Sequence, residues 1–273
     1  MLRGISVMPL PDEELGSILV RACRTTGLSL YRFAHWYLGL PPKRGIHACD
    51  NLIPALSLLA HRPPLGILLA HTLVPYATAF LPPDSAEPIH TALLDNTSPT
   101  LLPWLGRVIP RWCPECLRED QRTHGIPYWH RAHCLPAVES CHLHGEQLLT
   151  PEGLKPAPER ANRALVFRGP QYLPGERPGQ TVRELTPTSV RQAFSIASAR
   201  ALSHSGMLPP LPLEPRLLER VLGRPLVRRA GGYVTDEALQ MRTTLLVLSQ
   251  VAELAIRTSG GGVQLELFTQ KNS

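Results

Sequence analysis

The stretch CPECLREDQRTHGIPYWHRAHCLPAVESCHLHGEQL, residues 113–148, holds most of the metal-binding side chains of this 273-residue chain. It contains two pairs of candidate ligands, each with a two-residue gap: Cys113 with Cys116, and Cys141 with His144. Such a gap lets a tight turn direct both side chains of a pair to one point, and any mixture of thiolates and imidazoles suits tetrahedral Zn²⁺. The spacing therefore predicts a zinc site formed by these four residues.

The predicted zinc site is structural rather than catalytic, because four protein ligands leave no position on the metal for a reacting water. Two nearby side chains, His133 and Cys134, offer an alternative in which one of the four ligands is exchanged. In another alternative the thiols are free and bind no metal. Otherwise we expect His130 and His133 to lie around the ligands, and Tyr128 and Trp129 to supply a small apolar core.

Cysteine usage and hydropathy bear on the compartment. Residues 1–10 lack the apolar core of a signal peptide, and no stretch reaches the roughly 20 apolar residues of a membrane helix. We therefore expect a cytoplasmic protein without membrane contact, in which reduced cysteines favour metal over disulfides. A redox-active C-x-x-C is disfavoured because its usual strand-and-helix context is missing. Cys23 and Cys49 are expected to be small buried hydrophobic residues.

Residues 15–38 are predicted to form a helix-turn-helix-like pair. Apolar residues recur at helical spacing after an acidic start, Gly27 suits a left-handed turn, and Ser29 can cap the second helix. Phe33 and Trp36 are expected to face inward. The exposed face of the second helix is then expected to contact a nucleic acid or a protein partner through Tyr31, Arg32 and His35.

The chemistry of that exposed face does not favour reading of DNA bases. It offers a single Arg and no Asn or Gln to pair with base edges. The net charge of +6 comes almost entirely from Arg, which suits phosphates, but these residues form no long basic run. A simple helical hairpin within a bundle is the structural alternative to a DNA-reading element.

The rest of the chain predicts a mainly α protein, with a helix-turn-helix-like helical bundle, a small zinc-finger module and a C-terminal helical region. The 29 prolines and 20 glycines favour short helices over a large sheet. Further helices are expected at residues 51–61, 65–73, 76–81, 188–202, 213–221 and 236–257. The expected domains are an N-terminal helical domain at 1–100, a zinc-binding module at 101–150, a linker or extended segment at 151–187, and a C-terminal helical domain at 188–273.

An enzymatic role is not expected from the sequence. Clustered carboxylates, a nucleophile motif and a phosphate-binding loop are missing, and the predicted metal site has no open position. The sequence therefore favours a binding protein over a nuclease or hydrolase.

Two stretches of the chain resemble the TniQ family. PLPDEELGSILVRACRTTGLSLYRF, residues 9–33, resembles the family's proline, acidic pair and first helix. In the second stretch CPECL, the D-x-x-x-x-G of Asp120 and Gly125, YWHRAH, LPAVESC and HLHGEQL follow the family's pattern. The resemblance covers roughly residues 5–150. The chain departs from the family at Cys134, where relatives usually have Gln.

The resemblance implies a non-catalytic adaptor in DNA transposition that links a target-recognition complex to an AAA+ ATPase of the TnsC type. In some such systems the target complex is an RNA-guided CRISPR effector, and in others the protein reads target DNA itself, in the manner of TnsD. This chain is shorter than the TnsD-like readers, which favours the guided role. The alternative is a sequence-specific DNA-binding protein that uses the helix-turn-helix. A homodimer is also expected, because the helical ends expose apolar stripes.

Overall fold

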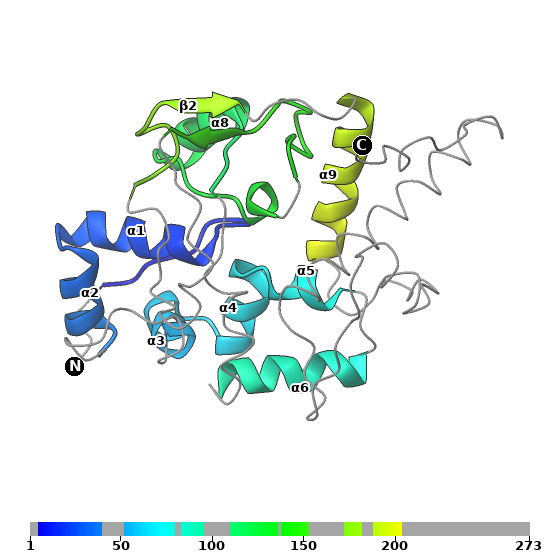
Figure 1. Cartoon of the computed structure of the whole chain (residues 1–273). Coiled ribbons are helices and arrows are strands. Elements are labelled where there is room, and N and C mark those ends of the chain that lie inside the picture. Colours follow the sequence, from blue (N-terminus) through cyan, green and yellow to red (C-terminus); the bar gives the residue numbers. More distant parts are fainter. Residues whose placement is uncertain are drawn as a thin grey trace, which may run out of the picture.

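A computed structural model describes seven ranges of the chain: residues 5–39, 52–79, 83–95, 110–135, 138–152, 172–181 and 188–203. Within them the protein is mainly α-helical, as the sequence predicted, with a small Cys/His-rich part and little strand. Figure 1 shows this part above the N-terminal helices, with helix α9 (Thr188–Ser203) beside both. The helices predicted at 213–221 and 236–257, and Cys49, lie outside the described residues.

The first two helices have the capping residues that helix physics requires. Helix α1 (Leu15–Thr26) begins after Glu14, whose carboxylate accepts hydrogen bonds from the backbone N–H groups of Gly16 and Ser17. It ends at Gly27, where φ is 66°. Ser29 accepts a hydrogen bond from an N–H of helix α2 (Leu30–Tyr37) and so caps it. The predicted pair of helices and the turn between them are therefore present.

One side chain of this pair points the other way from the prediction. Trp36 was expected to face inward, but 62% of it is exposed. It lies one turn after Arg32 and shares that exposed face, whereas Phe33 and Ala34 are buried. Phe33 stacks on Tyr37 with a centroid distance of 5.1 Å, so the inner face of α2 is filled without Trp36.

The described residues of the N-terminal bundle also form helices α3 (Leu52–Ala60), α4 (Pro64–His71), α5 (Val74–Thr78) and α6 (Pro83–Leu94). The helix predicted at 76–81 starts earlier, because Pro75 fits its first turn, where no backbone N–H is needed. Helix α6 was not predicted, since Pro88 lies inside it and reads as a break. The main core gathers apolar side chains from α1 to α4 and α6, including Leu15, Ile18, Leu19, Phe33, Leu52, Leu56, Ile67, Leu68 and Leu93.

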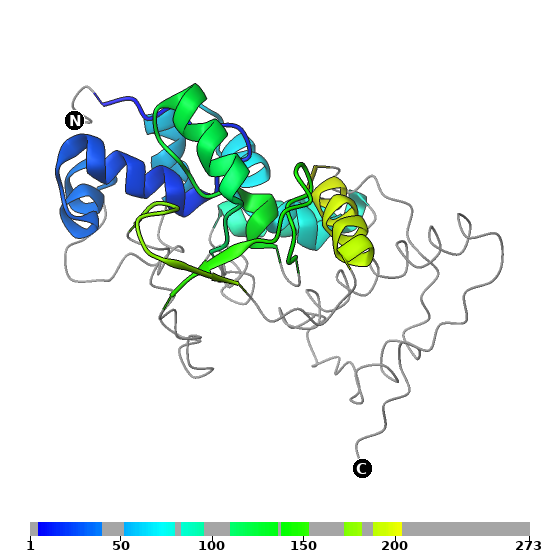
Figure 2. The same ribbon diagram turned by 90° about the horizontal axis from the view of Figure 1, so that it is seen from above.

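The Cys/His module, as we call the described residues between 110 and 152, contains α8 (Pro114–His124), a short 3-10 helix η1 (Arg131–Cys134) and strand β1 (Leu149–Pro151). Strand β2 (Gly179–Thr181) pairs antiparallel with β1, in a segment predicted to be a linker or extended. Gly179 is required there, because a Cβ atom would lie 2.6 Å from the Trp112 ring. Figure 2 shows these strands lying alongside α8.

Helix α9 packs against α5 and η1, and it shares a second core with the Cys/His module. Phe194 and Leu202 of α9 contribute to that core together with Tyr76 of α5 and Leu135. The buried hydroxyls of Ser140 and Ser195 are hydrogen-bonded at 2.9 Å. This helix therefore holds the Cys/His module against the bundle on one side.

A second junction joins the bundle to the module through residues 5–14, which precede α1 and which we call the strap. Asp12 has φ of 53°, a left-handed conformation that Asp tolerates. Its carboxylate accepts hydrogen bonds from Arg131 Nε at 3.0 Å and from the backbone N–H of Ala132 at 3.1 Å. Arg131 in turn donates to the carbonyl oxygens of Leu69 and Thr72 in the bundle.

Among the described residues, no single helix has both the length and the apolar composition needed to cross a membrane. Helices α3 and α4 satisfy the criterion only when taken together, and the chain bends by 99° between them.

The buried Glu14 predicts a pH dependence of stability. Burial raises its pKa to about 8, against the opposing effect of the hydrogen bonds from Gly16 and Ser17. Between about pH 4.5 and 8 the folded protein holds a proton that the unfolded chain releases, so stability is greatest at the acidic end and falls as pH rises. We expect this group to lower the free energy of unfolding by roughly 1 kcal/mol per pH unit across that window.

Denaturant unfolding from pH 5.5 to 8.5 measures this slope. Glu14→Gln keeps an oxygen for the helix N-terminus but does not titrate, so its slope should be flatter than that of the wild type. Equal slopes in the two proteins would show that Glu14 titrates normally in the folded state.

Candidate metal centre

The four predicted ligands come from two tight turns that face each other. Cys113 immediately precedes α8 and Cys116 lies in its first turn, so the helix start aims both sulfurs to one side. Cys141 and His144 lie in a turn closed by hydrogen bonds from Cys141 N to Glu146 O and from Gly145 N to Cys141 O. The three cysteines are buried, and His144 is half-buried at the edge.

The distances between these donors match a tetrahedral metal site. All four ligand atoms lie within 4.8 Å of one another. The Sγ atoms of Cys116 and Cys141 are 3.7 Å apart, and His144 Nδ1 lies 3.3, 3.6 and 3.7 Å from the sulfurs of Cys116, Cys141 and Cys113. Bonds of about 2.3 Å to sulfur and about 2.0 Å to nitrogen place tetrahedral ligands about 3.5–3.8 Å apart. The residues present therefore fit a metal ion.

The charges of the three cysteine sulfurs also favour a bound cation. Hydrogen bonds from the Cys113 and Cys116 thiols lower the pKa of Cys141 well below its usual range, so one thiolate forms easily. The same contacts, together with burial, raise the pKa of Cys116 far above its usual range, because a second negative charge would lie beside the first. A bound metal removes this conflict, since it stabilises all the thiolates at once.

The imidazole of His144 has a partner of the kind that metal ligands use. Its Nδ1 faces the sulfurs, while its Nε2 lies 3.5 Å from a carboxylate oxygen of Glu119 on α8. A carboxylate behind a metal-bound histidine fixes the ring and strengthens its lone pair. Glu119 was not singled out from the sequence. The sequence could have indicated Glu119 once residues 114–124 were recognised as a helix, because Glu119 follows Cys116 by three residues and so lies on the same helix face.

The two alternative ligands predicted from the sequence lie in different places. His133 is fully buried, and its Nε2 lies 3.4 Å from the sulfur of Cys141 and 3.8 Å from that of Cys116. Burial lowers the pKa of His133 to about 3, so the ring is neutral. Cys134 is outside the group of four and is buried, which raises its pKa. Cys23 is half-buried on α1, away from the cluster.

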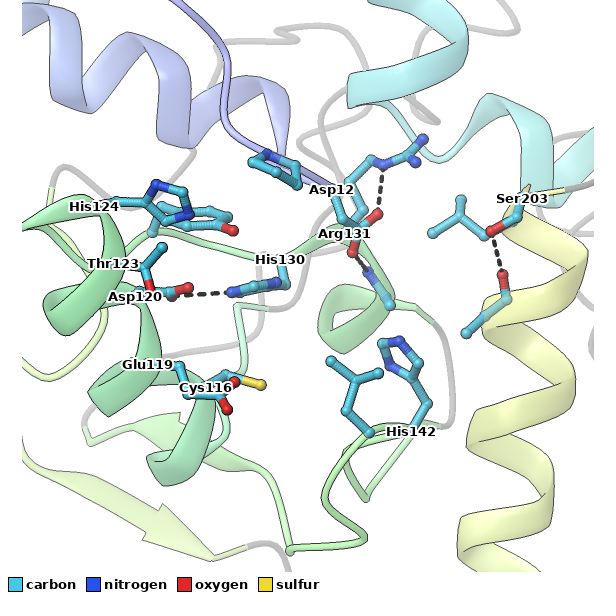
Figure 3. Close-up of a pocket in the computed structure, with 16 residues that line it drawn as sticks. Asp12, Cys116, Glu119, Asp120, Thr123, His124, His130, Arg131, His142 and Ser203 are labelled. Atoms are coloured by element: carbon cyan, nitrogen blue, oxygen red, sulfur yellow. Dashed lines mark hydrogen bonds and ion pairs between the residues drawn. The ribbon is translucent and has the colours of Figure 1, made fainter.

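A cavity of about 450 Å³ lies between α8, η1 and α9, and Cys116 is the donor of the four that lines it (Figure 3). On one wall Asp120 and His130 form an ion pair, with 2.9 Å between His130 Nε2 and Asp120 Oδ2. The Tyr128 ring stacks on His130. Burial lowers the pKa of His130, but the hydrogen bond and charge of Asp120 outweigh it and raise that pKa overall. The predicted apolar side chains Tyr128 and Trp129 are both buried.

The three contact residues predicted on the second helix are exposed and lie away from the metal donors. Figures 1 and 2 both place α2 at the opposite end of the described structure from α9. The exposed face of α2 carries Tyr31, Arg32 and His35. The structure therefore brings the four Cys/His residues together, and it leaves the α2 residues on a separate surface.

Comparison with protein families identifies one family model that matches this chain. The family model TniQ matches residues 5–148, which span the N-terminal bundle and the Cys/His module. The chain belongs to the TniQ family. TniQ proteins are accessory factors in the selection of transposition targets, and they are not catalytic. A comparison with curated proteins gives no match.

Loss of one sulfur should cost this TniQ protein its metal. We expect Cys141→Ser to abolish metal binding and to leave the Cys/His module loosely folded, because a buried cluster of donors then lacks its cation. Metal content per chain and limited proteolysis measure both effects. Cys23→Ser, a cysteine change away from the cluster, should keep the metal. A Cys141→Ser protein that is metal-free but as protease-resistant as the wild type would refute the structural role.

The carboxylate behind His144 gives a finer test. Glu119→Gln should weaken metal binding by roughly 10–100-fold without unfolding the protein, because the ring loses its charged partner. Competition with a chromogenic chelator measures the affinity. Glu115→Gln is the matched control, since Glu115 lies on the same helix and pairs with Arg118 instead. Equal affinities of the two variants would remove Glu119 from the metal centre.

Proposed function

We propose that this protein is a non-catalytic adaptor of DNA transposition that links a target-recognition complex to an AAA+ regulator of the TnsC type. The observation that carries the proposal is the family match over residues 5–148, which spans the N-terminal bundle and the Cys/His module. The Cys/His module and the N-terminal bundle are joined through Asp12 and Arg131, which supports a single rigid platform for two partners.

The metal in this proposal is structural Zn²⁺. Three thiolates and one imidazole form a donor set that zinc prefers, and their mutual distances suit its tetrahedral geometry. Four protein donors fill that geometry, so this ion supplies folding free energy and does not activate a water. The role of the protein is then binding, with the reaction left to the transposition enzymes.

The face of α2 is the proposed contact surface for one partner. It exposes two large aromatic side chains, Tyr31 and Trp36, together with Arg32 and His35. Tyr, Trp and Arg are the side chains that dominate binding energy at protein interfaces. This composition supports a protein partner, the ATPase or an RNA-guided effector complex, over direct reading of target DNA.

Co-purification with the proteins encoded beside its gene tests the adaptor role. We expect the full chain to retain the AAA+ ATPase, a guide-RNA complex, or both. Replacing both aromatic residues, Tyr31→Ala with Trp36→Ala, should weaken that complex by at least about tenfold, because two exposed anchors are lost.

Leu58→Ala on α3 is the matched control, because Leu58 is equally exposed but lies on another helix. It should leave binding unchanged. If neither partner is retained, and the protein instead binds one DNA duplex selectively with strong salt dependence, the site-reader alternative replaces the adaptor.

A further inference from the structure

A second group of metal donors lies directly beside the four proposed zinc ligands. One nitrogen from each of His133 and His142 and the sulfur of Cys141 lie within 4.8 Å of one another. His133 Nε2 is 3.4 Å from the Cys141 sulfur. We infer that these three residues form a second Zn²⁺ site, which shares the Cys141 thiolate with the first. The inference rests on the proposed function, because it requires the first site to hold zinc.

The charge of the first site favours a second cation. Three thiolates against the two positive charges of Zn²⁺ leave that centre with one net negative charge in a buried place. A thiolate bound to one metal keeps lone pairs that a second metal can use. His133 and His142 are neutral ligands, so a second Zn²⁺ held by them adds no further anion and offsets the negative charge.

His133 presents one ring nitrogen to the sulfur that the two sites share. Its side chain is buried, and its Nε2 contacts the sulfurs of Cys141 and Cys116. Its other ring nitrogen, Nδ1, has no hydrogen-bond partner within the described ranges. Nε2 is the nitrogen that a cation beside Cys141 would bind, whereas Nδ1 faces away from it across the ring.

The surroundings give the second site access to solvent. Figure 3 shows His142 pointing into the cavity between α8 and α9, which Cys116 also lines. Asp12 and Asp120 in the same lining are paired with Arg131 and His130, so the carboxylate that favours the approach of a cation is that of Glu119. With three protein donors, the second Zn²⁺ keeps its fourth position for a water on the cavity side.

Metal stoichiometry of the full, untagged chain tests the second site. We expect two Zn²⁺ per chain by native mass spectrometry and elemental analysis after saturation with Zn²⁺ and removal of free metal. His142→Ala should hold one, with an unchanged circular dichroism spectrum, because the first four donors remain. His124→Ala is the matched control, since His124 lines the same cavity but lies outside the triad; it should hold two.

Cadmium-113 NMR of the Cd²⁺-loaded protein adds a readout specific to the shared sulfur. Two resonances with mutual coupling are expected in the wild type, and one in His142→Ala. If the wild type holds a single Zn²⁺, the second site is overturned and the proposed four-ligand zinc site stands. If the wild type holds none, both sites are overturned. Two ions that persist in His142→Ala would place the additional ion elsewhere and also overturn this site.

Discussion

The ion pair between Asp12 and Arg131 is the contact on which the arrangement of the described structure depends. Burial alone would lower the pKa of Arg131, so the guanidinium stays charged because Asp12 and two backbone carbonyls of the bundle surround it. Removing Asp12 would leave a cation buried without its counter-charge, which is among the most destabilising changes in proteins. One arginine of the Cys/His module thus fixes both the strap before α1 and the end of α4.

The candidate metal ligands and the apolar side chains of the module share one core in this protein. Cys113, Cys116 and Cys141 belong to the second hydrophobic cluster, together with Leu148 and residues of α5 and α9. The module alone has few large apolar side chains, and a metal ion supplies folding free energy that such a small core lacks. Because α9 packs on this cluster, a loss of the metal would also loosen the contact between the module and the bundle.

The features that were predictable from the sequence are the local ones. Gly27 and Ser29 set the turn after α1 through their own backbone and side-chain preferences, and the two-residue gaps of the Cys/His pairs set each turn in the same way. The predictions that failed concern features set by contacts between residues far apart in the chain. The exposure of Trp36 follows from how α2 packs on its neighbours, and the pairing of β2 with β1 has no periodic signal in strands of three residues. The partners of Asp12 and His144 likewise come from tertiary structure.

The contacts between the strap and the module join residues that are far apart in the chain. Asp12 and Arg131 are separated by 119 positions in the chain. Ser17 accepts a hydrogen bond from the backbone N–H of Trp129, which lies 112 positions later. During synthesis the ribosome therefore releases the whole N-terminal bundle before its docking surface exists. Until residues 110–148 emerge, the part of α1 that these contacts cover stays exposed, so the nascent chain remains open to chaperones and proteases for that time.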